Sequence, residues 1–320
     1  MGAAAELELV SADVSGALPA GWDAPRTGRL IVAVPPGYAL DRVARSHGWS
    51  GLAPTAYDRR TRTLHRVLAL PQAGARGVAV AQRASGLVVS WGGGPLSAAD
   101  RRAVAAQVSR MLAVTADLRE LHAGCAGHPD LHWVPAAGAG ALLRSPTVWE
   151  DLAKTLATTN CSWALTQLIC TRLVDTLGAV GEHAERAFPT PEAVRDAGAG
   201  HLRDVVRVGY RGQAFLELAG TVADGALDPE AWWDPELSDH HVLLAIRALR
   251  GFGPYAAEGM LGLLDRPRGL ALDSWVRAKL PRLLGREAMT DAEIAGRYAP
   301  LGRWAGTGLW LELTRDWFEG

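Results

Sequence analysis

Residues 245–280 read AIRALRGFGPYAAEGMLGLLDRPRGLALDSWVRAKL, and they are the most informative part of the chain. Two helical segments meet at the glycine-containing stretch Leu249–Gly253, where Gly-x-Gly permits a tight turn with a positive φ angle. The second helix is predicted to begin at Pro254, since proline fits the first helical position. Its first backbone amides have no partner inside the helix and suit an anion such as a phosphate. An ordinary helical hairpin with a glycine turn is the alternative, and this motif alone leaves it open.

A carboxylate follows the hairpin at a fixed distance. Asp273 comes 18 residues after Tyr255, in the sequence Leu272–Asp273–Ser274–Trp275–Val276. An aspartate at this position usually serves as a helix N-cap, and that role is expected here as well. A chemical role for Asp273 is the second possibility, because it follows a potential phosphate-binding hairpin.

Helical signals extend in both directions from the hairpin. Ser97 with Asp100 and Thr290 with Glu293 resemble capping boxes, and Thr190–Pro191–Glu192 places a proline after an N-cap. Helices are predicted near residues 97–114, 147–157, 161–177, 211–223, 239–248, 254–264, 274–284, 290–297 and 303–317. The short connections between these segments suit a compact helical array.

The first 95 residues have a different pattern. Arg29–Pro35 and Gly86–Trp91 are short β-branched runs bounded by Gly and Pro, Thr63–Leu70 alternates, and Tyr38–Ser46 is expected to be helical. We therefore predict a mainly α protein with a small α+β domain. An antiparallel β/α domain is expected over residues 1–115, and a helical domain over residues 116–320.

Composition and charge exclude several classes of protein. The chain has 320 residues, of which 48% are hydrophobic, so it is not a disordered chain. It shows neither a signal peptide nor an apolar run of about 18 residues, and its three cysteines cannot make a disulfide framework. A cytoplasmic location is therefore expected. With 33 basic and 34 acidic residues, a strongly positive overall field is absent.

The paired motifs resemble the helix-hairpin-helix DNA glycosylase superfamily, in which a glycine hairpin precedes a catalytic aspartate by about this distance. Gly140–Leu177, Phe188–Glu192, Val208–Arg211 and Trp304–Trp310 also resemble the 8-oxoguanine DNA glycosylases. The resemblance covers about residues 116–320. It implies an antiparallel-sheet domain in front of a helical domain and the excision of a damaged base from double-stranded DNA. A monomer acting at the nucleoid is the corresponding expectation.

The resemblance also assigns roles to individual residues. Asp273 is the expected catalytic carboxylate, Asn160 fills the space left by a flipped base, and Tyr210 and Arg211 match the wedge and the contact to the orphaned partner base. Asn160 is also expected to cap the helix that begins at Cys161. The remaining DNA contacts fall on the hairpin, at Leu249, Arg250, Gly251, Phe252, Gly253, Tyr255 and Ala256. The base pocket is assigned to Trp310, Trp163, Trp275 and Tyr255, and Trp304 is a further candidate.

Four departures put 8-oxoguanine specificity in doubt. The lysine of strand-cleaving relatives is replaced by Tyr255, and the base-reading glutamine by Gly306. The cytosine-reading arginine falls at Leu165, and a histidine after the aspartate is Trp275. An aromatic residue at the lysine position is similar instead to bacterial 3-methyladenine DNA glycosylase II.

We therefore expect a monofunctional enzyme acting on an alkylated purine, with water as the nucleophile. Only Lys154 and Lys279 could supply an amine, and both lie outside the hairpin. Lys279 is expected to face away from Asp273, since it follows by more than one helical turn. A glycosylase for an oxidised purine and a non-catalytic DNA-binding module remain the alternatives.

No cofactor is expected. Four residues, His122, Cys125, His128 and His132, have spacings that could ligate zinc, but Pro129 interrupts them and a loop is the preferred interpretation. No cysteine lies beyond Cys170, so an iron–sulfur cluster with four cysteine ligands is excluded. The resemblance implies that the hairpin turn could bind a monovalent cation through backbone carbonyls.

Overall fold

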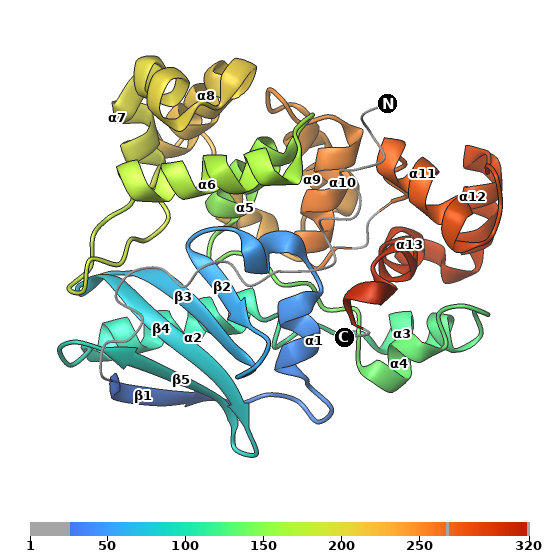
Figure 1. Ribbon diagram of the computed structural model, residues 1–320, viewed down its shortest axis with the longest axis horizontal. Coiled ribbons are helices and arrows are strands. Elements are labelled where there is room, and N and C mark those ends of the chain that lie inside the picture. The colour runs from blue at the N-terminus through green and yellow to red at the C-terminus, as the bar shows by residue number, and fades with distance from the viewer. Residues whose placement is uncertain (1–25, 267–268, 319–320) are drawn as a thin grey trace.

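The computed structural model describes residues 26–266 and 269–318. Its first part is a five-stranded antiparallel sheet with the strand order β1-β5-β4-β3-β2 (Figure 1). The strands are β1 (Arg26–Val32), β2 (Thr55–Asp58), β3 (Thr63–Leu70), β4 (Gly74–Arg83) and β5 (Gly86–Gly92). A mainly helical region follows, so the predicted fold class is confirmed.

The sequence located three of these strands. The alternating run Thr63–Leu70 is β3, and the run from Gly86 is β5. β1 is displaced from the expected range, since it begins at Arg26 and ends before Pro35. The short strand β2 and the long strand β4 were not predicted. β4 has the sequence GARGVAVAQR, in which glycines, alanines and arginines obscure the β-branched pattern typical of strands.

The helical region is an array of short helices joined by tight connections (Figure 1). The α-helices are α1 (Leu40–Arg45), α2 (Ala98–Met111), α3 (Arg119–Ala126), α4 (Trp133–Ala137), α5 (Val148–Thr158), α6 (Trp163–Leu177), α7 (Pro191–His201), α8 (Gly212–Ala223), α9 (Asp239–Arg247), α10 (Pro254–Leu263), α11 (Ser274–Leu283), α12 (Asp291–Tyr298) and α13 (Ala305–Leu313). Between them lie a π-helix, η2 (Leu202–Val206), and the 3₁₀ turns η1 (Gly48–Gly51), η3 (Gly209–Arg211), η4 (Pro229–Trp233), η5 (Ala299–Trp304) and η6 (Arg315–Trp317).

Local capping signals were good guides to where helices begin. The Ser97 and Thr190 side chains accept the amides of Asp100 and Ala193, and Thr290 with Glu293 forms a complete capping box. The helix expected from Cys161 instead begins at Trp163, because Ser162 is its N-cap. The last predicted helix, 303–317, is divided into η5, α13 and η6.

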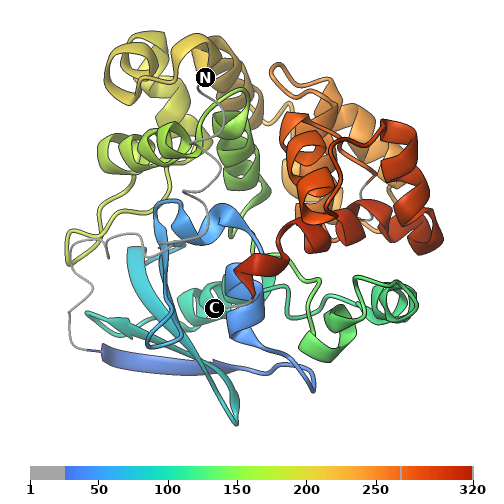
Figure 2. The ribbon, with the colours of Figure 1, turned by 45° about the vertical axis from the view of Figure 1, so that its right-hand side comes forward.

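Two large apolar clusters organise the part of the chain that the structure describes. The larger cluster joins the sheet and α2 to α5, α6, α8, α9 and α10, so the sheet shares a core with these helices. The smaller cluster joins α3 and α4 to α11, α12 and α13. Figure 2 shows the green ribbon of α3 and α4 below the orange and red ribbon of these C-terminal helices. The domain boundary at residue 115 stays a prediction. Within the described ranges, every helix is too short or too polar to cross a membrane.

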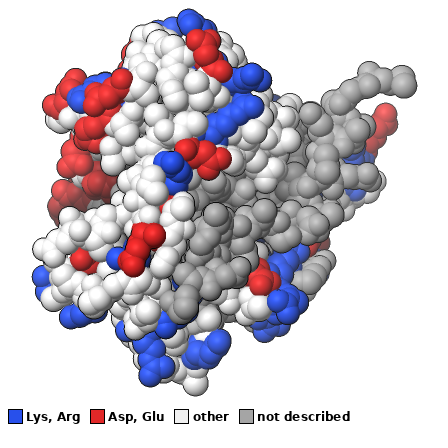
Figure 3. Space-filling view, turned by 60° about the vertical axis from the view of Figure 1, so that its left-hand side comes forward, with Lys and Arg blue, Asp and Glu red and all other residues white. Residues whose placement is uncertain are grey.

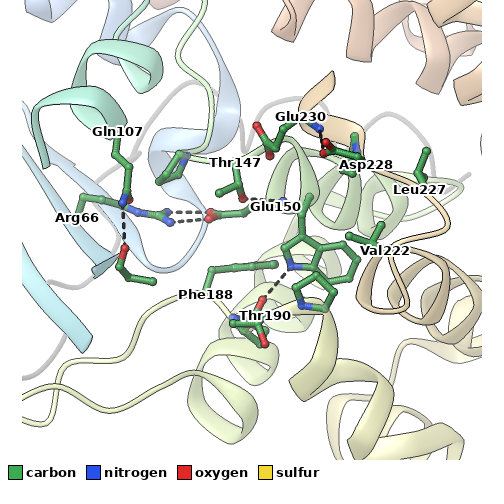
Figure 4. Close-up of a pocket in the computed structure, with 17 residues that line it drawn as sticks. Arg66, Gln107, Thr147, Glu150, Phe188, Thr190, Val222, Leu227, Asp228 and Glu230 are labelled. Atoms are coloured by element: carbon green, nitrogen blue, oxygen red, sulfur yellow. Dashed lines mark hydrogen bonds and ion pairs between the residues drawn. The ribbon is translucent and has the colours of Figure 1, made fainter. Parts of the chain in front are cut away.

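A buried ionic cluster connects the sheet to α5. The Arg66 guanidinium of β3 donates two hydrogen bonds, of 2.8 and 2.5 Å, to the Glu150 carboxylate in the first turn of α5 (Figure 4). The Lys154 ammonium lies 2.7 Å from the same carboxylate, one turn later. All three side chains are at most 3% exposed. The two cations lower the pKa of Glu150 to about 2, although burial alone would raise it.

We predict that Glu150→Gln lowers the free energy of unfolding at pH 7 by about 3 to 5 kcal/mol, because it leaves two buried cations without a counter-charge. Chemical denaturation with urea measures this change. Glu217→Gln is the matched control on the surface, where its ion pair with Arg250 is exposed and is expected to contribute at most about 1 kcal/mol.

The lowered pKa of Glu150 also predicts how the stability of the protein depends on pH. A carboxyl whose pKa falls on folding stabilises the protein fully above its unfolded pKa, near 4.5, and this contribution is lost as the pH falls toward about 2. The wild type should therefore lose more stability than Glu150→Gln between pH 5 and pH 2, values chosen to bracket the two pKa values. Equal losses would show that Glu150 does not carry this charge.

Candidate active site

The loop between α5 and α6 meets a distant turn of the chain. Asn160 lies in this loop, is exposed, and has a φ angle of 45°. Its side-chain amide donates to the Tyr210 hydroxyl at 3.2 Å, and this hydroxyl donates to the Thr159 carbonyl at 3.3 Å. The Tyr210 side chain is nevertheless 70% exposed. An exposed aromatic ring and a left-handed asparagine therefore sit together at the surface.

Arg211 holds these two segments together. It is only 4% exposed, and its guanidinium donates to the carbonyls of Thr159 and Asn160. The guanidinium also lies 4.7 Å from the centre of the Tyr210 ring. The structure thus brings together three of the residues assigned to the DNA contact. Arg211 positions the other two, and its own side chain has little surface left for a base.

The hairpin has the predicted glycine turn between α9 and α10. Gly251 has a φ angle of 90°, whereas Gly253 is extended (φ −78°, ψ −179°) and precedes Pro254 as the N-cap of α10. The side chains of Phe252 and Ala256 are buried in the larger core, so only their backbone can face a ligand. Arg250 is exposed and pairs with Glu217 at 3.2 Å.

The backbone carbonyls of the hairpin are the expected ligands of a monovalent cation. The Leu249 carbonyl accepts the Phe252 amide at 3.1 Å, and the Gly253 carbonyl accepts the Ala257 amide at 3.0 Å. Each oxygen keeps a second lone pair, so these carbonyls are compatible with a monovalent cation. Cation binding stays a prediction, and no step of the proposed chemistry depends on it.

Asp273 is the N-cap of α11, as its position in the sequence predicts. Its Oδ1 accepts the Val276 amide at 2.8 Å. Among the residues that the structure describes, none donates a hydrogen bond to Oδ2. The second carboxylate oxygen is therefore available to a substrate or a water molecule. A capping role and a chemical role are therefore compatible.

Aromatic rings from four segments gather beside α13. The Trp310 ring lies 6.1 Å from Trp275 of α11, 5.6 Å from Trp317 of η6 and 5.7 Å from His47, which precedes η1 (centroid distances). The Trp310 indole also donates to the Ser46 carbonyl at 3.0 Å. We call Trp275, Trp310, Trp317 and His47 the aromatic cluster.

The other pocket candidates have separate positions. Trp163 packs on Gly48, where an added Cβ would lie 2.5 Å from its ring, so it borders the segment that carries His47. Tyr255 lies in the first turn of α10 and is 42% exposed. Trp304 is covered by the Arg303 guanidinium, 5.4 Å from its ring, and contacts the smaller core.

The two lysines occupy different environments. Lys154 is buried in the ion cluster with Glu150, so its amine is inaccessible. Lys279 lies over the Trp275 ring at 5.3 Å and pairs with Asp316 at 3.3 Å. Helical spacing separated Lys279 from Asp273, but it did not indicate that the amine borders the aromatic cluster.

The four residues considered as zinc ligands have separate environments, and the segment is not a loop throughout as predicted, since His122 and Cys125 lie on α3. His122 contacts the Ala139 carbonyl, and His132 contacts the Pro129 carbonyl. His128 stacks on Tyr298, and burial raises the pKa of the Cys125 thiol to about 11. Within residues 26–266 and 269–318, no three histidine, cysteine or acidic side chains are grouped as metal ligands.

Comparison with known proteins complements this geometry. No family model matches the chain, and no curated protein matches it. Solved structures do. The 3-methyladenine DNA glycosylase of Archaeoglobus fulgidus is similar with a TM-score of 0.64 and 20% identity, over 89% of this chain and 98% of that one. The chain has the helix-hairpin-helix DNA glycosylase fold.

Two further structures support the same fold. MBOgg1 in complex with a low-affinity DNA ligand has a TM-score of 0.69 and 16% identity, over 93% of this chain and 98% of that one. The Clostridium acetobutylicum 8-oxoguanine glycosylase/lyase in its apo-form has a TM-score of 0.68 and 14% identity, over 92% and 98%. Both kinds of glycosylase are therefore structural neighbours, at low identity.

Sequence reasoning missed several residues around the aromatic cluster. His47, Trp49 and Trp317 carry no local motif, and Trp310 and Ser46 are separated by 264 positions. Only the number of tryptophans, 12 in the chain, gave a signal, and it could not select among them.

The two hairpin glycines should respond differently to substitution. Gly251→Ala places a side chain at φ 90°, with its Cβ 2.6 Å from Leu156, and should lower the free energy of unfolding by at least about 1 kcal/mol. At Gly253 the backbone is extended and an added Cβ meets open space, so Gly253→Ala should change the free energy of unfolding by less than about 0.5 kcal/mol. Thermal or urea unfolding measures both, and equal losses would contradict this turn geometry.

Proposed function

We propose that the protein is a monofunctional DNA glycosylase that excises a damaged purine, most readily an alkylated one, from double-stranded DNA. The observation that carries this proposal is the meeting of Asn160, Tyr210 and Arg211 at the surface of a glycosylase fold. An ordinary surface loop does not need an exposed tyrosine ring, a left-handed asparagine and a buried arginine that fixes both.

The first requirement of base excision is to hold the duplex open. A base that leaves the stack creates a gap and an unpaired partner, and a protein side chain must compensate for both. In our proposal Asn160 enters the gap and the Tyr210 ring stacks on the orphaned base. Arg211 positions both side chains, and its hydrogen bonds to Thr159 and Asn160 keep the loop in place before DNA arrives.

The second requirement is to break the glycosidic bond. The bond between C1′ of the sugar and the purine nitrogen breaks, the base leaves with the bonding electrons, and positive charge develops on the sugar. The ionised Asp273 stabilises this charge and orients water toward C1′ through Oδ2, while Oδ1 stays on the Val276 amide. As the new C–O bond forms, water gives its proton to the carboxylate or to solvent. A cationic base leaves as a neutral molecule, whereas a neutral base takes up a proton from solvent as it leaves.

The third requirement is a place for the flipped base, and we assign it to the aromatic cluster. Indole rings attract a cation through their π faces, which favours a positively charged alkylated purine. Because Trp310 lies next to the three other rings of the aromatic cluster, it is the ring assigned to the base. An oxidised purine is the second candidate, since 8-oxoguanine glycosylases are among the structural neighbours. A non-catalytic DNA-binding module is the third.

Asp273→Asn tests the proposed chemistry directly. Asparagine caps helices as well as aspartate, so the variant should fold normally and bind damaged DNA within a few-fold of the wild type. Base release should fall by at least about a hundredfold, because the lost charge acts in the transition state. Single-turnover release of free base measures the rate, and Asp291→Asn on α12 is a matched surface control. A folded Asp273→Asn enzyme with unchanged release would refute the assignment.

The product is expected to be an intact strand with an abasic site. Strand cleavage by a lyase needs an amine that attacks the sugar, and the corresponding position is Tyr255, whose phenol has a typical pKa of about 10. Lys154 is buried, and Lys279 is paired with Asp316. Borohydride should therefore trap no protein–DNA adduct, and strands should break only after hot alkali. An adduct that disappears in Lys279→Gln would overturn this part of the proposal.

A further inference from the structure

Arg207 has an unusual backbone conformation close to Tyr210. It follows the π-helix η2 and has φ 62° and ψ 46°, in the left-handed region. Residues other than glycine, asparagine and aspartate are disfavoured in this region, because their Cβ atom crowds the following carbonyl oxygen. Residues held in this way persist only when the surrounding structure fixes them, and they concentrate at functional sites.

The surrounding structure does fix this backbone. The amides of Arg207 and Val208 both donate to the Leu202 carbonyl. The carbonyls of Val206 and Val208, on either side of Arg207, accept hydrogen bonds from the Arg172 and Arg211 guanidiniums at 3.5 and 3.3 Å. Val206 and Val208 are fully buried. Hydrogen bonds therefore fix the backbone on both sides of Arg207, and one of them comes from Arg211, which also positions Tyr210.

The side chain of Arg207 is not used by the fold. It is exposed, and among the described residues no carboxylate or carbonyl accepts a hydrogen bond from its guanidinium. The neighbouring Arg203, in contrast, pairs with Asp204 at 2.8 Å through two nitrogens. A conformation that would be easier for glycine thus presents an unpaired cation three residues before Tyr210.

We propose that Arg207 binds a backbone phosphate of the DNA strand opposite the damaged base. This inference rests on the proposed function, because Tyr210 is the group that we place on the orphaned base of that strand. A guanidinium forms paired, charge-assisted hydrogen bonds with a phosphodiester. The clamped backbone would place it there without further ordering of the loop.

The overall charge makes such a contact important. The chain has a formal net charge of −1. On the face shown in Figure 3, the coloured side chains are a mixture of basic and acidic groups rather than a continuous basic surface. An individual cation placed against a phosphate should contribute to the affinity for DNA and to the salt dependence of binding.

Arg207→Gly separates binding from folding. Glycine relieves the left-handed conformation, so the melting temperature should be unchanged or higher, whereas the loss of a structural contact would lower it. Binding to a duplex with an abasic-site analogue, which needs no catalysis, should weaken roughly tenfold at about 0.1 M salt. The slope of log K against log salt should fall by about 0.9, the value for one phosphate on duplex DNA.

Two controls locate the contact. Arg203→Gln removes an equal charge that is already neutralised by Asp204, and should leave the salt slope unchanged. Neutral methylphosphonate linkages beside the orphaned base, in the opposite strand, should weaken wild-type binding and leave Arg207→Gly unaffected.

Three outcomes test the phosphate contact of Arg207 separately from the proposed glycosylase function. Weaker binding with a reduced slope and an undiminished melting temperature supports the phosphate contact. If Arg207→Gly binds the abasic analogue as tightly as the wild type does, with the same salt slope, the inference is overturned and the glycosylase proposal still stands. A wild type that neither prefers the abasic analogue over undamaged duplex nor releases any base contradicts the proposed function, and the inference fails with it.

Discussion

Two adjacent buried carboxylates in the first turn of α5 hold the molecule together. Glu150 receives the guanidinium of Arg66 from the sheet, so the sheet cannot shift against α5 without exposing an unpaired charge. Asp151 accepts hydrogen bonds from the Trp49 indole at 2.8 Å and from the Ser145 amide at 2.8 Å. It also pairs with Arg110 of α2. One helical turn therefore fixes the sheet, α2 and the segment around η1.

The segment from Ser46 to Trp49 transmits this constraint to the candidate site. Trp49, held by Asp151, lies 4.2 Å from the His47 ring, and His47 lies 5.7 Å from Trp310. The Ser46 carbonyl accepts the Trp310 indole, and the Ser46 hydroxyl accepts the Leu143 amide. Residues of the N-terminal part of the chain thus contact the aromatic cluster, whereas Asp273 and the hairpin lie in the helical region. This contact gives the N-terminal part of the chain a direct role in positioning Trp310.

The parts of the structure that depend on local chemistry could be predicted from the sequence. Gly251 needs a positive φ angle, Thr290 and Glu293 form a capping box, and Asp273 caps α11, and each of these features is set within a few residues. β4 could not be found, because its glycines, alanines and arginines conceal a strand that its two neighbours stabilise. The resemblance to a known family, rather than periodicity, brought Asn160 and Arg211 together. The contact of Trp310 with Ser46 and His47, and the unused cation of Arg207, depend on tertiary packing and became visible only in the structure.

Release of free base is the reaction that defines a glycosylase, and it can be measured directly for the activity that we propose. The purified protein is incubated with duplexes that each carry one lesion, including cationic alkylated purines, neutral alkylated purines and 8-oxoguanine, and the released bases are separated by chromatography. We expect release of at least one alkylated purine, fastest for a cationic one, with abasic sites formed in equal number. Release of 8-oxoguanine alone would change the assigned substrate. Binding to these duplexes without release of any base would contradict the claim that the protein is a glycosylase.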